Sequence, residues 1–301
     1  HEVMALVQAL EAGADEALML DIHGFVATCN ATNFFMVKNG EINMKFLPRI
    51  SPEDKRFGEG YAERTKQISR YFKQEYEKLK AERETPAYHR ERLLANYLYK
   101  GPVLEWYAKI KTAMEKNYSP FHQLVPLQGK ILDIGCGYGF MDYMLYFLSE
   151  EREITGIDYD EEKVATANHC YSKTEKINFM HGSAVDMDFD NYDCFILSDV
   201  LHYLRPEEQE SLLRKCFAHL NPGGVAIIRD GDKDLVERQK GTWWTEFFST
   251  RFCKFNKVTE HGLSFMSGRA ITAIAHEFGL HVERIDQTKF TSNVIFVVQS
   301  R

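Results

Sequence analysis

The residues best suited to chemistry in this 301-residue chain stand at the ends of apolar runs rich in β-forming side chains. Asp133 ends one such run, and Gly135, Gly137 and Gly139 follow at once. Glycines at such a turn permit positive φ and let a ligand approach bare main chain. Asp158 ends the next apolar run, about 20 residues past the turn, where a carboxylate can accept hydrogen bonds from ribose hydroxyls. These residue types predict an adenosine-binding site.

A second polar group, Ser198, Asp199 and His202, follows a later apolar run. In open α/β sheets ligands bind beyond the carboxyl ends of the strands, so these side chains are in the right place for chemistry. His202 could take a proton from an acceptor hydroxyl, because its unperturbed pKa is about 6.5. The alternative is a histidine that caps or packs on the adjacent helix. We take Asp199 and His202 as the candidate catalytic residues.

Alternating strand and helix patterns must position both groups. From Phe121 onward apolar strand patterns alternate with helical ones, which is typical of a parallel sheet covered by helices on both faces. The expected parallel strands are 130–134, 153–158, 177–181, 193–197 and 225–228, followed by a helix at 267–278 and strands at 282–286 and 293–299. The predicted fold class is therefore α/β, a Rossmann-like doubly wound sheet.

The strand, glycine turn and helix of residues 130–148 resemble the first motif of class I S-adenosylmethionine-dependent methyltransferases. The run Ser198–Leu204 is similar to the fourth motif of that family, and Leu220-Asn221-Pro222-Gly223-Gly224 before a strand is common in it. The resemblance covers residues 44–301. It implies S-adenosylmethionine as the cofactor, a methyltransferase activity and an antiparallel last strand.

The resemblance also implies roles for single residues. Asp133 is expected near the methionine end of the cofactor, with the glycines packed under it. Many relatives have an aspartate for the adenine amino group where Ser183 stands in this chain. A serine accepts more weakly, so Asp186 could substitute. The rest of the predicted cofactor site is Tyr159, Ala184 and Ser198.

Two other function classes stay open. A nicotinamide-dependent oxidoreductase shares the glycine turn and Asp158, but its G-x-G-x-x-G pattern needs a small residue where Phe140 stands. A non-catalytic nucleotide-binding protein would also keep the turn. Narrower resemblances of Arg56–Tyr61 and Tyr99–Trp106 to uncharacterised bacterial methyltransferases of lipid or aryl-pigment gene clusters imply a small hydrophobic, aromatic or lipid-like acceptor.

Residues 44–120 are predicted to form a helical extension ahead of the methyltransferase domain at 121–301. Helical patterns run from 61 to 84, 88 to 100 and 103 to 116, with breaks at Thr85-Pro86 and Gly101-Pro102. Helices before the first strand could form a lid over the acceptor site, or simply pack on the domain. The aromatic stretch 233–268 could supply another wall, or form a separate hydrophobic cluster.

Residues 1–43 differ from the rest. Gly13–Leu18, Gly24–Thr28 and Asn33–Phe35 resemble a piece of the class IV aminotransferases, near the branched-chain enzymes. The lysine that binds pyridoxal phosphate in that family lies upstream of the matching region, so no aminotransferase activity is expected. Asn39-Gly40 between apolar runs predicts a hairpin.

Composition excludes several other classes. The net charge of −7 argues against a nucleic-acid partner, and no apolar run approaches the roughly 20 residues of a membrane span. The six cysteines are scattered without a C-x-x-C pair, which indicates free thiols in a reducing cytosol and no metal site. The first residues show no signal peptide. We therefore expect a cytoplasmic enzyme with a small-molecule acceptor, and the sequence does not indicate its oligomeric state.

Overall fold

The computed structural model describes residues 19–20, 26–28, 33–38, 41–47, 50, 54–114, 117–235, 262–286 and 292–300. The chain divides into two compact units, His1–Glu84 and Thr85–Arg301. The predicted helical extension at 44–120 is thus shared between them. Within the described ranges no helix combines the length and the apolar character that a bilayer crossing requires.

Within its described residues, the first unit contains two strand pairs and one long helix. Strand β1 (Met19–Leu20) pairs antiparallel with β2 (Val26–Thr28), and β3 (Asn33–Lys38) pairs antiparallel with β4 (Glu41–Phe46). Lys38 lies opposite Glu41, so two residues connect these strands, as the hairpin prediction requires. Strand β4 runs across residue 43, and the predicted boundary there stays a prediction.

The long helix α2 (Tyr61–Arg83) follows a short 3₁₀ turn, η1 (Lys55–Phe57). Its lysines, arginines and glutamates are strong helix formers, and Gln67 donates to Glu63 one turn earlier. The helix ends because Thr85 precedes a proline and is extended, with φ −105° and ψ 142°. Pro86 then starts the next helix, where its missing N–H costs nothing.

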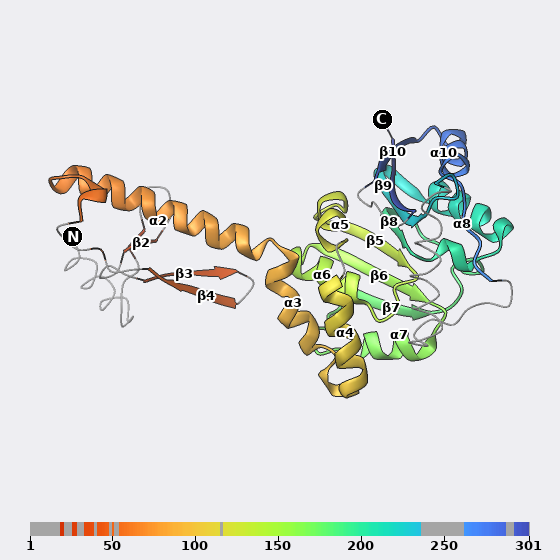
Figure 1. Ribbon diagram of the computed structural model, residues 1–301, viewed down its shortest axis with the longest axis horizontal. Helices are drawn as coiled ribbons and strands as arrows, with labels where there is room; N and C mark the ends of the chain where they lie inside the picture. The colour runs from red at the N-terminus through yellow and green to blue at the C-terminus, as the bar shows by residue number, and fades with distance from the viewer. Residues whose placement is uncertain are drawn as a thin grey trace. The chain divides into compact units, whose positions relative to one another are not determined.

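The second unit is built on a seven-stranded sheet of order β10-β11-β9-β8-β5-β6-β7 (Figure 1). The five neighbouring strands β9, β8, β5, β6 and β7 are parallel to one another, and β11 runs antiparallel to both of its neighbours. This arrangement confirms the predicted Rossmann-like fold with its antiparallel last strand. The strands are β5 (Gly129–Ile134), β6 (Arg152–Asp158), β7 (Ile177–His181), β8 (Tyr192–Ser198), β9 (Leu220–Gly231), β10 (His281–Ile285) and β11 (Asn293–Gln299).

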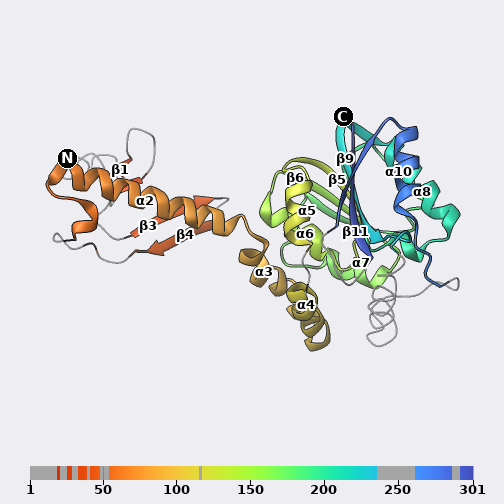
Figure 2. The same ribbon diagram turned by 45° about the horizontal axis from the view of Figure 1, so that its top comes forward.

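Helices cover both faces of this sheet (Figure 2). Alternate strand residues point to opposite sides, as Ile131 and Leu132 do in β5, and each side has its own hydrophobic core. One core includes α3 (Pro86–Ala95), α4 (Pro102–Met114), α5 (Tyr118–Leu124), α6 (Phe140–Leu148) and α7 (Glu161–Asn168). The other includes α8 (Pro206–Ala218) and α10 (Gly268–Glu277). Two short 3₁₀ turns complete the unit, η2 (Leu98–Lys100) and η3 (Leu201–Tyr203).

Strand β9 begins earlier than the sequence predicts. The turn formers of 221–224 lie inside it, because Tyr192 of β8 faces Leu220 whereas Cys194 faces Val225. The extra residues are taken up in an irregularity of the strand, where Gly223 has φ 78°. The predicted turn coincides with this irregularity, but the sequence did not predict that the residues on both sides of it pair with β8.

A buried arginine fixes α5 to this framework. Arg152, at the start of β6, has no exposed surface, and burial lowers its pKa to about 10, so it stays charged at neutral pH. Its guanidinium donates to the carbonyls of Val125 at 2.9 Å and Pro126 at 2.7 Å, directly after α5, and to that of Leu145 in α6 at 2.7 Å. A third carbonyl at the end of α5, that of His122, accepts at 3.3 Å. One charged group therefore satisfies several helix-end carbonyls.

Candidate functional site

The glycine turn between β5 and α6 has the backbone that only glycine adopts readily. Gly135, Gly137 and Gly139 have φ of 80°, 58° and 75°. A Cβ on Gly135 would lie 2.7 Å from the Val200 side chain, and one on Gly139 would lie 2.5 Å from that of Phe179. A Cβ on Gly137 would meet nothing within 4 Å. Packing therefore requires two of the glycines, and the third leaves bare main chain facing open space.

Asp158 is held beside this turn by main-chain donors. One carboxylate oxygen accepts the Gly137 N–H at 2.8 Å, and the other accepts the Asp160 N–H at 2.8 Å. Asp160 caps α7 in turn, accepting from the main-chain N–H groups of its first turn. The Asp158 side chain is thereby fixed, with lone pairs left for a ligand.

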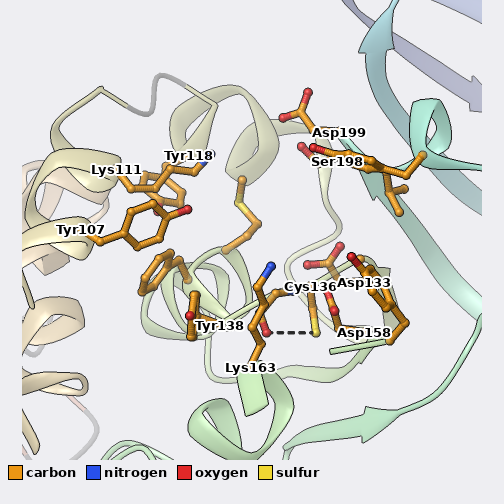
Figure 3. A pocket seen from close by; sticks show the side chains of 17 residues that line it. Tyr107, Lys111, Tyr118, Asp133, Cys136, Tyr138, Asp158, Lys163, Ser198 and Asp199 are labelled. Atoms are coloured by element: carbon orange, nitrogen blue, oxygen red, sulfur yellow. Dashed lines mark hydrogen bonds between the residues drawn. The ribbon is translucent and has the colours of Figure 1, made fainter. Parts of the chain in front are cut away.

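A pocket opens over the carboxyl ends of β5, β6 and β8 (Figure 3). Asp133, Gly135, Gly137 and Asp158 line one part of it, which we call the carboxylate floor. Tyr107 and Lys111 of α4 and Tyr118 of α5 line another part, which we call the aromatic wall. In Figure 3 the labelled side chains of the aromatic wall stand apart from those of Asp133 and Asp158.

Aromatic contacts join the wall to the glycine turn. The Tyr107 ring centroid lies 6.1 Å from that of Tyr138 and 6.1 Å from that of Phe140. Tyr97, between α3 and η2, donates its hydroxyl to the Tyr138 carbonyl at 2.8 Å. Helix α4, part of the predicted helical extension, thus packs on the turn and lines the pocket with it.

The end of β8 supplies the side of the pocket formed by Ser198 and Asp199. Asp199 has φ 55°, a conformation that non-glycine residues rarely adopt outside functional sites. Its N–H donates to the Arg229 carbonyl at 2.8 Å, and its carboxylate forms an ion pair with the Arg229 guanidinium. These contacts fix the Asp199 carboxylate at the rim of the pocket.

His202 does not line this pocket. Its ring is buried, with Nδ1 2.7 Å from one Asp230 carboxylate oxygen, and the main-chain N–H of His202 donates to the other oxygen at 3.1 Å. The neighbouring Tyr203 lines the pocket instead. Geometry therefore supports the alternative that the sequence left open, a histidine that packs, because η3 turns successive side chains in different directions.

Most of the predicted site residues do meet. Those that line the pocket are Asp133, Gly135, Gly137, Asp158, Tyr159, Ser198 and Asp199. Gly139 packs beneath the turn, against Phe179. Ser183 and Ala184 are not among the lining residues: the Ser183 carbonyl accepts from the Asp186 and Met187 N–H groups in a turn after β7.

Several lining residues were not predicted. They are Tyr107, Lys111, Tyr118, Cys136, Tyr138, Phe140, Met141, Lys163, Val200 and Tyr203. Tyr138 lies in the glycine turn and Tyr203 in the run Ser198–Leu204, so the sequence could have indicated both as site residues. Lys111 and Tyr118 carried none beyond the general suggestion of a helical lid. The aromatic stretch has its residues 236–261 outside the described part of the chain, so its role as a wall stays a prediction.

The carboxylate floor fits an adenosyl sulfonium. Bare main chain at Gly137 leaves room for a ligand, the fixed Asp158 carboxylate suits ribose hydroxyls, and Asp133 offers negative charge to a cation. Tyr159, next to Asp158, also lines the pocket, and the cofactor roles of Ser183 and Ala184 stay predictions.

Comparison with known proteins identifies the domain. Residues 131–224 match the model of a methyltransferase domain family. Curated relatives include the carboxy-S-adenosyl-L-methionine synthase of Shewanella baltica, 27% identical over 106 residues, which is 34% of this chain and 44% of the relative. The enzyme of the same name from Campylobacter concisus is 25% identical over 121 residues, or 40% of this chain and 51% of the relative. The chain spans about half the length of these relatives.

Solved structures share the fold. The pyocyanin biosynthetic protein PhzM matches with a TM-score of 0.51 and 15% identity, covering 68% of this chain and 61% of that protein. The mitomycin 7-O-methyltransferase MmcR matches with a TM-score of 0.50 and 14% identity, covering 65% and 57%. These structures confirm the predicted fold. The match to the domain family and the curated relatives confirm the predicted methyltransferase domain, and they agree with S-adenosylmethionine as its cofactor class. The resemblance of residues 1–43 to aminotransferases stays a prediction.

Proposed function

We propose that this chain transfers the methyl group of S-adenosylmethionine to a small hydrophobic or aromatic acceptor. The observation that carries the proposal is the pocket itself, in which the carboxylate floor and the aromatic wall face one open space. The floor has the charge and the bare main chain that a cationic nucleoside needs, and the wall has the rings that pack on a flat apolar molecule.

In this proposal the cofactor is held by residues of the floor. Bound S-adenosylmethionine supplies a methyl group on a good leaving group, a sulfonium. Asp158 accepts hydrogen bonds from the ribose hydroxyls, and Asp133 provides the counter-charge for the cationic end. Gly137 lets the adenosyl group lie against the main chain. The work left to the protein is alignment of the two reactants and exclusion of water.

The acceptor lies against the aromatic wall in this proposal. Tyr107 and Tyr118 pack on its ring, and Lys111 stands at the same side of the pocket to meet a polar or anionic substituent. Asp199, fixed by its ion pair with Arg229, is the carboxylate that receives the acceptor's proton where one must leave. In place of the predicted base role, we assign His202 a positioning role. Its contacts with Asp230 hold η3 in place, and Tyr203 of the same turn lines the pocket.

The cofactor is tested first. Mass spectrometry of the protein as purified should detect S-adenosylmethionine or its demethylated product, and calorimetry should measure binding of either one. The measured mass also distinguishes S-adenosylmethionine from carboxy-S-adenosyl-L-methionine, the compound that appears in the names of the curated relatives. Binding of a nicotinamide cofactor with no heat from S-adenosylmethionine would favour the oxidoreductase alternative.

The transfer is tested with labelled S-adenosylmethionine and a panel of small phenols, hydroxybenzoates and fatty acids. Label in an aromatic product supports the proposal. Cofactor binding without transfer to any member of the panel would support a non-catalytic nucleotide-binding protein instead.

A further inference from the structure

Exposed apolar side chains gather on α4 and in the turn directly before it. Among the residues described, eleven large hydrophobic side chains are exposed, and five of them lie within residues 98–110. These five are Leu98 (54%), Tyr99 (48%), Val103 (70%), Trp106 (59%) and Ile110 (37%). Single exposed hydrophobic residues are normal on a protein surface, whereas a cluster of them marks a surface that binds a partner, a ligand or a membrane.

Three of these side chains form a stripe along the helix. Val103, Trp106 and Ile110 are three and four residues apart, so they lie on one face of α4, and we call them the apolar stripe. Leu104 and Ala108 are buried and hold another face of the helix in the core of the domain. In Figure 2, α4 lies farther from the sheet than α6 does. The packing of α4 on the domain therefore leaves the apolar stripe on the outside.

The apolar stripe borders the face of α4 that lines the pocket. Tyr107 comes four residues after Val103 and three before Ile110, so it is a neighbour of both on the helix surface. Tyr107 lines the pocket, as does Lys111 one turn later. Whatever binds the apolar stripe is therefore next to the aromatic wall.

The segment that contains the stripe is basic. Residues 86–114, which form α3, η2 and α4, contain five lysines and arginines and two glutamates, a net charge of +3 in a chain whose net charge is −7. An anionic lipid surface attracts such a segment and repels the rest of the chain. The distribution of charge therefore turns the α4 side of the second unit toward an anionic surface.

Basic side chains of α3 and α4 lie close together. Arg90 of α3 donates to the main-chain carbonyl of Lys109 in α4 at 3.0 Å. Lys109 forms an ion pair with Glu105 one turn earlier, and Lys100 pairs with Glu162 of α7 at 3.1 Å. Exposed pairs of this kind contribute little free energy, so their lysines can turn to lipid head groups instead. Long lysine and arginine stems let the charges stay at the head groups while the apolar stripe enters the interface.

A second copy of the chain fits the apolar stripe less well than a lipid surface does. A symmetric dimer would bring the basic segments of both copies face to face, and like charges repel each other. A stable protein interface also uses roughly 20 to 30 residues a side, whereas the exposed cluster has five. An interfacial helix needs only a few apolar side chains flanked by cations, and tryptophan prefers the boundary between lipid and water.

We propose that α4 docks on an anionic lipid surface, with Val103, Trp106 and Ile110 inserted among the lipids and the neighbouring lysines and arginines at the head groups. This inference goes beyond the proposed function, because docking requires neither the cofactor nor a transfer. Its consequence for the reaction rests on the proposed function. Docking places Tyr107 and Lys111 beside the lipid, so a lipid-like acceptor can pass from the bilayer to the pocket.

Sedimentation of the full chain with sucrose-loaded vesicles tests the docking. Vesicles of phosphatidylcholine alone are compared with vesicles of equal parts of phosphatidylcholine and phosphatidylglycerol. The partition coefficient should be at least about tenfold higher on the anionic vesicles, because several cations face the surface. It should fall as the salt concentration rises, because salt screens exposed charges.

Single substitutions separate the apolar and the charged contributions. Trp106→Ser should lower the partition coefficient on anionic vesicles about tenfold, whereas Leu127→Ser, at a 60% exposed leucine before β5, is the matched control and should not. Lys109→Gln should lower it about fivefold. Lys176→Gln, at an exposed lysine that pairs with Glu151, is the control for charge and should leave it unchanged. Thermal unfolding establishes that each variant is folded.

The outcomes are distinct from those that test the proposed function. No sedimentation with anionic vesicles would overturn the docking and leave cofactor binding and transfer as they are. An equal loss in Trp106→Ser and Leu127→Ser would also overturn it, because the binding would then not depend on the apolar stripe. A dimer in light scattering that Trp106→Ser separates into monomers would identify a second copy as the occupant, in place of the lipid.

Discussion

The carboxylate floor and the aromatic wall present different parts of the chain to a ligand. The floor offers main chain at Gly137 and two carboxyls, Asp133 and Asp158, all positioned by residues within one βαβ segment. The wall offers side chains of α4 and α5, which reach the pocket through packing on Tyr138 and Phe140. In the proposed function the floor binds the cofactor and the wall contacts the acceptor. Four substitutions test that division.

Gly137→Val should have the largest effect. The new side chain would occupy the open space beside the main chain, at a φ of 58° that valine resists, so cofactor affinity should fall by more than about a hundredfold. Gly223→Val is the control, because its φ of 78° and open surroundings impose the same strain away from the pocket. Calorimetry measures both. Similar affinities in the two variants would mean that strain alone acts.

Asp158→Ala should come next. It removes a fixed carboxylate from the floor, and a hydrogen bond to a charged group contributes about 1.5–3 kcal/mol, so affinity for S-adenosylmethionine should fall ten- to a hundredfold. Equilibrium binding of the cofactor is the measurement. An unchanged dissociation constant would refute the assignment of Asp158 to the ribose hydroxyls of the cofactor.

Tyr107→Ala tests the wall. Loss of one packed ring should raise the KM for an aromatic acceptor about tenfold, roughly 1.4 kcal/mol, while the cofactor dissociation constant changes less than twofold. Tyr171→Ala, at an 84% exposed tyrosine outside the pocket, should change neither constant. A large loss of cofactor affinity in Tyr107→Ala would show that wall and floor are one site.

His202→Gln should have the smallest effect. The glutamine loses the contact with Asp230 but leaves both halves of the pocket in place, so cofactor binding should persist and turnover should fall less than about tenfold. The pH profile of turnover should keep its shape. If the acidic limb of that profile disappears and turnover falls a hundredfold or more, His202 is the base after all.

The difference between the carboxylate floor and the aromatic wall also explains which pocket residues the sequence could predict. Residues of the floor follow from local spacing, because a strand, a glycine turn and a second strand meet at one sheet edge in any parallel βαβ unit. The parallel part of the sheet was predictable for the same reason, whereas the antiparallel last strand was expected only from the resemblance to class I methyltransferases. Tyr118 and Lys111 gave no such signal, since their place depends on how α4 and α5 pack on α6.

The differences between the predicted site and the lining of the pocket have local causes. His202 and Tyr203 are neighbours after β8, and which of them faces the pocket depends on a 3₁₀ turn that no periodicity marks. Ser183 was placed by resemblance to relatives, and since it is not among the lining residues its role at the adenine stays a prediction.

Arg152 has a consequence for how such a protein can diversify. Its guanidinium binds main-chain carbonyls at and just after the end of α5, and it also contacts the His122 ring nitrogen at 3.3 Å. Tyr118, at the other end of the helix, can therefore be exchanged without loss of these contacts. A few substitutions on α5 could therefore change which acceptor binds, while the residues that bind the cofactor stay the same.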